Sequence, residues 1–102
     1  MARYDVYASP NGASFLLDVQ ADLLDDLNTR VVVPLMSVNA APAPARQLNP
    51  MFDIRSERCV MATQFLSAVP VSILKTPVVS LAKYDREIDG ALDMLLAGCD
   101  RW

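Results

Sequence analysis

The spacing of apolar residues changes once along this chain, near residue 80, and this change constrains the fold more than any other feature. Before that point apolar residues alternate with polar ones or form short runs, as in half-buried or fully buried β-strands. After it they recur every three or four residues, as on the buried face of an amphipathic helix. The pattern predicts a mainly β fold with one C-terminal helix. The expected strands cover residues 3–7, 15–20, 31–36, 51–54, 59–63 and 69–74, and the helical stripe consists of Leu81, Tyr84, Ile88, Ala91, Leu92, Leu95 and Leu96.

Prolines and short polar segments mark the expected connections between the strands. Residues 9–12 and 55–58 are rich in turn-forming or polar residues, and each predicts a hairpin between its flanking strands. Pro34 has no N–H to donate, which predicts that this end of the third strand lies at a sheet edge or a bulge. Three prolines make residues 39–50 an irregular surface loop.

The ends of the helix are marked by capping residues. Either Ser80 is the N-cap, or Thr76 is the N-cap and Pro77 is the first helical residue. Gly98 is expected to end the helix in a left-handed conformation, after roughly 16–18 helical residues.

The composition is that of one folded domain over residues 1–102. Hydrophobic residues make up 53% of the chain, which excludes intrinsic disorder and indicates that some apolar surface is buried against another chain. The formal net charge is −3, and no basic cluster is present. Direct binding to nucleic acid is therefore not expected, because contacts of basic side chains with phosphates dominate that affinity.

The chain has no histidine, which removes the commonest general base and metal ligand. Cys59 and Cys99 are forty positions apart and form neither a zinc nor a redox motif. Two reduced thiols are the favoured interpretation, and a disulfide between them is the alternative. No nucleophile has a base beside it, so no catalytic residue, metal or cofactor is expected. The N-terminus lacks the apolar segment of a signal peptide and no apolar run approaches ~18 residues, which predicts a cytoplasmic protein.

Three surface features are candidates for binding a partner. Acidic residues gather at 18–26 and 85–93, either as a face that attracts a basic partner or as ordinary solvated surface. Leu23 and Leu24 are adjacent between charged residues, and at least one is expected to be exposed or at an interface unless both pack locally. Trp102 is either a binding anchor or an exposed ring at a frayed terminus.

One longer motif carries a resemblance to a known family. Residues 18–25 read DVQADLLD, and residues 29–35 read TRVVVPL. This segment resembles the CcdB family of plasmid-maintenance toxins, whose pattern is DVQ, one variable residue, D, two aliphatic residues and D, then an arginine and an aliphatic strand that ends in Pro-Leu. The aromatic strand at 4–7, the Ser-x-Val-Pro-Val segment at 67–71 and the helix at 87–98 also fit, and residues 39–50 are the least similar.

The resemblance implies a small SH3-like β-barrel of the CcdB–MazF type that forms a homodimer and has no catalytic activity. Such a dimer binds the A subunit of DNA gyrase and traps the enzyme on cleaved DNA. A CcdA-type antitoxin neutralises it, and the toxin–antitoxin complex represses its own operon, so operator DNA is bound only through that complex. By position, the gyrase contacts fall on Leu23, Leu24, Asp93, Leu96, Ala97, Gly98 and Cys99.

Two further expectations concern particular residues. Ala97 stands where the best-known member has a tryptophan, and Trp102 is the candidate to supply the missing contact with gyrase. An antitoxin is expected to touch the loops at 8–14 and 39–50, at Ser9, Asn11, Ala43 and Arg46.

Two alternative functions remain open at this level. A degenerate homologue would keep the fold and the antitoxin interface without poisoning gyrase. An endoribonuclease of the MazF/Kid group would share the fold, but RNA cleavage needs a placed acid and base together with basic residues for phosphate. A chain without histidine and with a net charge of −3 disfavours that reading.

Overall fold

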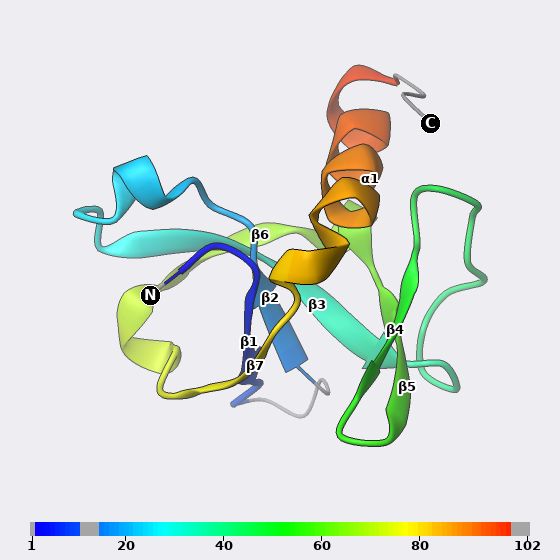
Figure 1. Cartoon of the computed structure of the whole chain (residues 1–102), viewed down its shortest axis with the longest axis horizontal. Helices are drawn as coiled ribbons and strands as arrows, with labels where there is room; N and C mark the ends of the chain where they lie inside the picture. The colour runs from blue at the N-terminus through cyan, green and yellow to red at the C-terminus, as the bar shows by residue number, and fades with distance from the viewer. Residues whose placement is uncertain (1, 11–14, 99–102) are drawn as a thin grey trace.

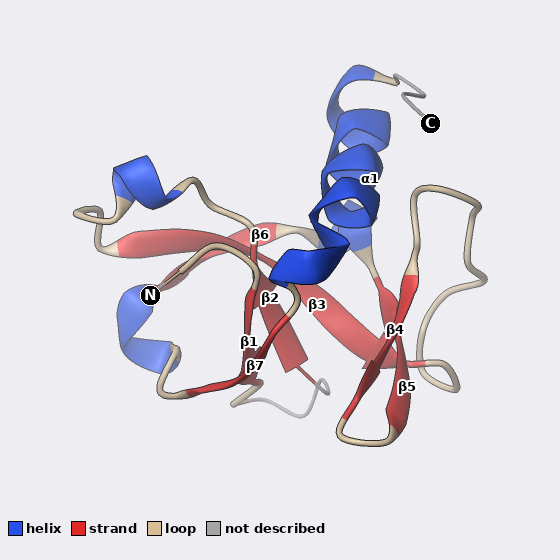
Figure 2. Ribbon diagram, in the orientation of Figure 1, coloured by secondary structure: helices blue, strands red, loops and turns tan. Residues whose placement is uncertain are grey.

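The structure is a computed structural model that describes residues 2–10 and 15–98. Its strands form one antiparallel sheet in the order β4-β5-β3-β2-β1-β7, and β6 pairs with β3 beside that row. The sheet twists strongly and stays open, with β4 and β7 at its two ends (Figures 1 and 2). The predicted mainly β fold with a C-terminal helix is confirmed, in the form of a half-barrel. The elements are β1 Asp5–Ala8, β2 Phe15–Asp18, β3 Thr29–Ser37, β4 Met51–Ile54, β5 Glu57–Met61, β6 Ser67–Pro70, β7 Pro77–Ser80 and α1 Asp85–Ala97.

The central strand, β3, has three partners. On one side it pairs with β2. On the other side residues 29–32 pair with β6 and residues 35–37 pair with β5. Pro34 lies at the gap between these two partners, where its missing N–H removes no ladder bond, and its carbonyl accepts a hydrogen bond from the N–H of Ala62 at 2.9 Å. The expected edge or bulge at Pro34 is therefore wrong, because the proline lies inside the sheet at a change of partner.

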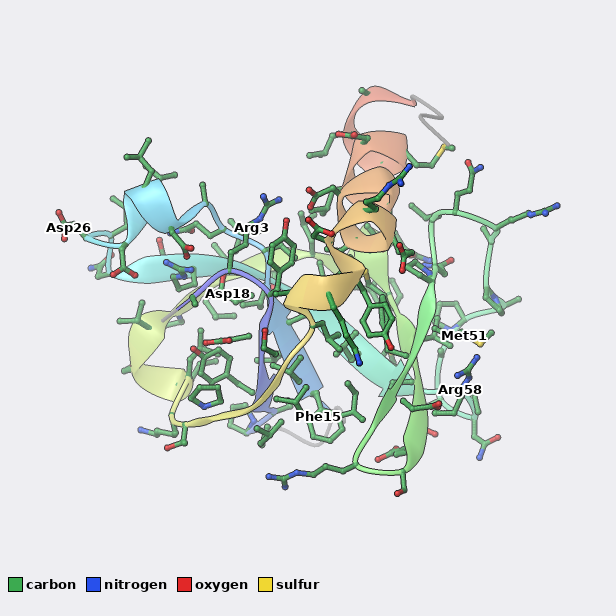
Figure 3. All side chains as sticks on the ribbon, viewed as in Figure 1. Arg3, Phe15, Asp18, Asp26, Met51 and Arg58 are labelled. Atoms are coloured by element: carbon green, nitrogen blue, oxygen red, sulfur yellow. The ribbon has the colours of Figure 1, made fainter. Side chains whose placement is uncertain are left out.

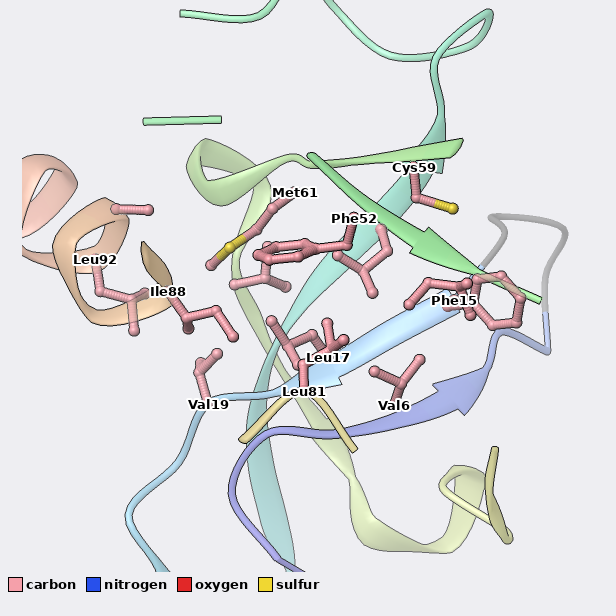
Figure 4. Packing of buried hydrophobic residues seen from close by; sticks show 14 residues of the cluster. Val6, Phe15, Leu17, Val19, Phe52, Cys59, Met61, Leu81, Ile88 and Leu92 are labelled. Atoms are coloured by element: carbon pink, nitrogen blue, oxygen red, sulfur yellow. The ribbon is translucent and has the colours of Figure 1, made fainter. Parts of the chain in front are cut away.

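Apolar residues are buried on both faces of the sheet. The larger cluster packs α1 against the sheet and includes Leu17, Ile88 and Leu92 (Figure 4). A smaller cluster contains Leu16 and Leu74. Since neighbouring residues of a strand point to opposite faces, β2 contributes to both clusters and all four of its residues are buried. The alternation in the sequence predicted only one buried face.

Both predicted hairpins are present, with small changes at their ends. β1 pairs with β2, and β4 pairs with β5. The turn of the second hairpin consists of Arg55 and Ser56 alone, which have φ angles of +51° and +67°. Two consecutive residues with positive φ match the twist of a tight hairpin. β5 therefore begins at Glu57 rather than at residue 59, and it ends at Met61.

The segment between β5 and the helix differs most from the prediction. The strand expected over residues 69–74 ends at Pro70, and a 3-10 turn, η3 Val71–Ile73, follows it. β7 was not expected; it forms because β1 offers an unpaired edge, to which β7 adds. Residues 39–50 contain neither strand nor helix, as predicted.

The helix begins later than the pattern predicted. A 3-10 turn, η4 Ala82–Tyr84, precedes α1, which has 13 residues. Tyr84 occupies the N-cap position, so the predicted starts at Ser80 and Thr76 are both wrong.

Candidate functional site

Leu23 and Leu24 lie on a 3-10 turn, η1 Asp22–Leu24, in the connection from β2 to β3. Leu23 is 93% exposed, Leu24 is 47% exposed, and Leu27 in the same connection is 50% exposed. The prediction that at least one of the adjacent leucines is exposed is confirmed. Leu27 was not predicted, although an apolar residue between aspartate and asparagine was a usable signal. We call Leu23, Leu24 and Leu27 together the leucine loop; it projects to the left in Figure 1.

A buried ion pair holds the base of the leucine loop. The side chains of Arg30 and Asp18 are fully buried, and Nε and Nη2 of Arg30 donate to Oδ2 of Asp18 at 3.0 and 2.6 Å. Nη1 of Arg30 donates to Oδ1 of Asp25 at 3.1 Å, and Oδ1 of Asp22 lies 3.8 Å from Nη2. Asp22 and Asp25 flank the two adjacent leucines, so one guanidinium ties both sides of η1 to the sheet.

Gln20 braces the same connection from inside. Its Nε2 donates to the carbonyls of Leu24 and Thr29, both at 3.2 Å, and its Oε1 accepts from the N–H of Val31 at 3.0 Å. The N–H of Gln20 donates to Oδ1 of Asp18 at 3.0 Å. The polar residues of the DVQADLLD motif therefore fix the shape of a loop whose exposed members are leucines.

The buried position of Asp18 corrects the reading of the first acidic window. Asp18 is neither solvated surface nor part of a steering face, because Arg30 covers it. Burial raises the pKa of its carboxyl, although the hydrogen bonds from Arg30 and from the N–H of Gln20 act in the lowering direction. Asp26 lies at the outer tip of the loop (Figure 3).

The end of α1 forms a second exposed apolar surface. Leu96 is 72% exposed, although the helical stripe predicted it on the buried face. The last turns of α1 extend beyond the sheet, so nothing in the described chain covers Leu96 (Figure 1). Asp93 is partly buried and Ala97 is exposed. Gly98 ends the helix with a φ of +61°, which confirms the predicted left-handed C-cap.

The N-terminal segment connects the leucine loop to the helix. The N–H of Arg3 donates to Oδ1 of Asp22 at 2.7 Å, and its Nη2 donates to Oδ1 of Asp89 on α1 at 3.1 Å. The hydroxyl of Tyr4 donates to the same carboxylate at 2.9 Å. Burial and this hydrogen bond raise the pKa of Tyr4 to about 12. Asp89 in the second acidic window is thus used to fix α1.

The predicted contact residues do not meet in a single chain. The leucine loop projects to the left in Figure 1, whereas α1 ends at the top, well separated from the loop. Ser9 follows β1, whereas Ala43 and Arg46 lie in the separate loop before β4. Asn11, Cys99 and Trp102 lie outside the described residues.

Within residues 2–10 and 15–98, no group of histidine, cysteine or acidic residues could hold a metal ion. Cys59 is a buried free thiol, and burial raises its pKa to about 11, with Glu57 and Asp53 adding to the effect. No helix in the described part is long and apolar enough to cross a membrane.

The open antiparallel half-barrel with a C-terminal helix is the fold class that the motif implied. A family model described as CcdB protein matches residues 3–98, and the chain belongs to the CcdB family. Membership in this family indicates a toxin of a toxin–antitoxin system, with an antitoxin as its partner.

Proposed function

We propose that this chain is the toxin of a type II toxin–antitoxin module and acts in the cytoplasm as a homodimer that poisons DNA gyrase. The dimer binds the gyrase A subunit and traps the complex of gyrase with cleaved DNA. The toxin itself makes and breaks no bond. The observation that carries the proposal is the leucine loop, in which the family motif builds a rigid support for exposed leucines.

The energetics of the leucine loop favour binding. Covering a leucine side chain with a partner contributes about 2 kcal/mol. The ion pair of Arg30 and Asp18 and the bonds of Gln20 fix the loop before binding, so little conformational entropy is lost on association. An exposed apolar surface on a fixed support is typical of a binding site rather than of a structural accident.

The end of α1 is proposed as the other gyrase contact, through Asp93, Leu96, Ala97, Gly98 and the following Cys99 and Trp102. Residues three or four apart lie on one helix face, which places Asp93 beside Leu96 and Ala97. A symmetric dimer presents two copies of each surface to a symmetric target. In a single chain the leucine loop and the end of α1 lie apart (Figure 1), so one chain does not present them as one binding surface. The dimer is proposed to present them together.

A CcdA-type antitoxin is proposed to fold onto the loops that carry Ser9, Asn11, Ala43 and Arg46, and the complex is proposed to repress the operon. The net charge of −3 favours a basic antitoxin segment, so added salt should weaken the association. Folding on binding should give a negative heat-capacity change and a gain of helix in the antitoxin. A circular dichroism titration without added structure would contradict this part.

A cleavage assay with purified gyrase tests the proposal. Wild-type protein should produce cleaved DNA linked to gyrase, and L23S should reduce it at least tenfold without a change in the free energy of unfolding. V38S is the matched control, because Val38 is also exposed but lies on another part of the surface. Equal loss of activity in the two variants would sink the role of the leucine loop.

The same preparation separates the alternatives. Antitoxin binding without gyrase-linked cleavage would identify a degenerate homologue, and cleavage of RNA would identify an endoribonuclease. Sedimentation equilibrium at micromolar concentration should give twice the 11.2 kDa chain mass. A mass of one chain would refute the homodimer.

A further inference from the structure

β4 is a terminal strand of the sheet, and its outer edge is unpaired within the described residues. The two-residue turn at 55–56 makes Ile54 and Glu57 a hydrogen-bonded pair. Because such pairs alternate in an antiparallel hairpin, the N–H and C=O groups of Met51 and Asp53 point away from β5. The bond from the N–H of Met61 to the carbonyl of Pro50 at 2.9 Å fits this alternation. Met51 and Asp53 therefore present two N–H donors and two carbonyl acceptors outward.

A hollow adjoins this edge. Residues 50–53 line it on one side and the start of α1 lines it on the other, and its volume is about 280 Å³. A neighbouring hollow of about 140 Å³ shares Pro50 and Glu87 with it. Phe52 and Tyr84, whose ring centroids lie 5.3 Å apart, are two of the residues that line the larger hollow. The larger volume is below the roughly 300–1,000 Å³ of a small-molecule site, so a side chain of a bound peptide fits better than a separate ligand.

The charges around the hollow favour a cation. Arg58 is already paired with Asp53, since its Nη1 lies 3.1 Å from Oδ1 of the aspartate. Glu87 lines both hollows, and in the described chain no side-chain hydrogen bond or ion pair engages it. Lys83 lies 5.2 Å from the centroid of the Tyr84 ring and does not line the hollow. The Glu87 carboxylate therefore leaves one negative charge unbalanced at the hollow that Phe52 and Tyr84 also line.

We infer that the outer edge of β4 binds an extended, basic peptide segment as an additional strand. Its backbone pairs with the N–H and C=O groups of Met51 and Asp53, and side chains two residues apart on the segment reach the same face. One apolar side chain fills the hollow against Phe52 and Tyr84, and an arginine or lysine meets Glu87. The inference rests on the proposed function only in naming the antitoxin as the source of the segment.

The edge itself disfavours pairing with a second copy of the chain. β4 is short, follows Pro50 and carries the charged Asp53, all of which protect a sheet edge from self-association. A second β4 would bring another Asp53 and another Glu87 to the same place, and like charges across a strand pair are destabilising. A basic segment instead brings positive charge to these carboxylates, so the interaction is attractive. The loop at 39–50, where antitoxin contacts are expected, leads directly into β4.

The probe for this inference is a fluorescein-labelled, N-acetylated octapeptide of alternating valine and arginine. Its matched control carries N-methyl groups on the alternate amides that would face β4, so it keeps the charge and loses the backbone donors. Fluorescence anisotropy on the full chain should show about tenfold weaker binding of the control. A valine–glutamate octapeptide should not bind measurably.

Two pairs of protein variants test the same contacts from the other side. M51P removes an outward N–H without breaking the β4–β5 ladder and should weaken binding about tenfold, whereas M51T keeps the N–H and should stay within about twofold. E87Q should weaken binding about threefold or more, and D85N, which also removes one exposed negative charge on α1, should not. If M51P does not fold, the N-methylated peptide on wild-type protein still decides the question.

The outcomes separate the inference from the proposed function. Equal binding of the methylated and unmodified peptides would overturn the strand pairing. Self-association of the wild-type chain that M51P abolishes would overturn it too and assign the edge to a second copy. The gyrase cleavage assay is run in parallel, and M51P should poison gyrase as the wild type does. If the chain binds the unmodified peptide more tightly than the N-methylated one but does not poison gyrase, only the proposed function fails. If it poisons gyrase but binds the two peptides equally, only the inference fails.

Discussion

Replacing Arg30 with alanine removes the guanidinium that lies against the carboxylate of Asp18. Both side chains are fully buried, and the two hydrogen bonds between them measure 3.0 and 2.6 Å. The variant leaves the carboxylate of Asp18 in the interior without a counterion. Breaking a buried pair in this way costs about 3–5 kcal/mol, a large share of the roughly 5–15 kcal/mol that stabilises a typical domain.

The matched control is the replacement of Arg58 with alanine. Arg58 and Asp53 also form an ion pair at 3.1 Å, but both side chains are more than half exposed. Water solvates and screens the partners there, so the loss should stay below about 1 kcal/mol. The double variant D18L/R30M removes both buried charges together and should lose far less than R30A alone.

Urea unfolding followed by circular dichroism measures these differences, provided that the denaturant slope stays constant. The pH dependence supplies a second readout. Because burial raises the pKa of Asp18 above its ordinary value of 3.8, the folded chain holds this proton more tightly than the unfolded chain. The contribution of Asp18 to stability is therefore present below pH 3.8 and falls as the pH rises through the raised value. In R30A the free energy of unfolding should fall further over this pH range than in the wild type. If R30A loses only as much free energy of unfolding as R58A, with an unchanged pH profile, the reasoning is refuted.

Four further predictions concern the rest of the chain. Burial raises the pKa of Cys59 to about 11, so in a C99S background iodoacetamide at about pH 8 should label the folded chain far more slowly than the chain in urea; rapid labelling of the folded chain would contradict its burial. As the pH rises from 9.0 through about 11, the unfolded thiol ionises first and the free energy of unfolding should fall. The variant G98A should lose about 1 kcal/mol in urea unfolding, since the φ of +61° strains alanine while its Cβ would meet nothing within 4 Å; a much larger loss would show that contacts, not the backbone, set the cost. Deleting residues 100–102 should weaken gyrase binding about thirtyfold, as expected for the loss of a tryptophan anchor worth ~2 kcal/mol, with an unchanged Tm; full affinity in a pull-down titration would make Trp102 an idle terminus.

Elements with a strong local signal could be predicted from the sequence. The helical stripe around Ile88 and the turn formers between the first two strands identify α1 and the first hairpin. The stretch after Pro70 could not be read locally, since Val71 and Ile73 have strand-like spacing but form a 3-10 turn. β7 depends on the unpaired edge of β1, which is about seventy residues earlier in the chain and visible only once the sheet exists.

The candidate site shows the same limit. The adjacent leucines could be recognised because two neighbouring apolar residues between charges have few ways to pack. The burial of Asp18 could not be recognised, because an aspartate at the end of a strand is indistinguishable from a solvated one until Arg30 is placed beside it. The hollow between β4 and α1 unites Phe52 with Tyr84 across more than thirty residues of sequence, and no local pattern links them.

The partner change of β3 has a consequence for how the molecule opens. β2, β5 and β6 all hydrogen-bond to β3, so the loss of any one of these three strands exposes part of β3, and β3 leaves the sheet only when all three pairings break. Amide protons in the part of β3 that faces β2 and β6 should therefore exchange with solvent through global unfolding, at the full free energy of unfolding, whereas those of β4, of β7 and of the β3 residues that face β5 exchange through cheaper local openings. Pro34 lies between the part of β3 that pairs with β6 and the part that pairs with β5, so β4 and β5 can detach together while β6 stays paired. The half that carries the outer strand edge can in this way fluctuate without disturbing the half that holds the leucine loop.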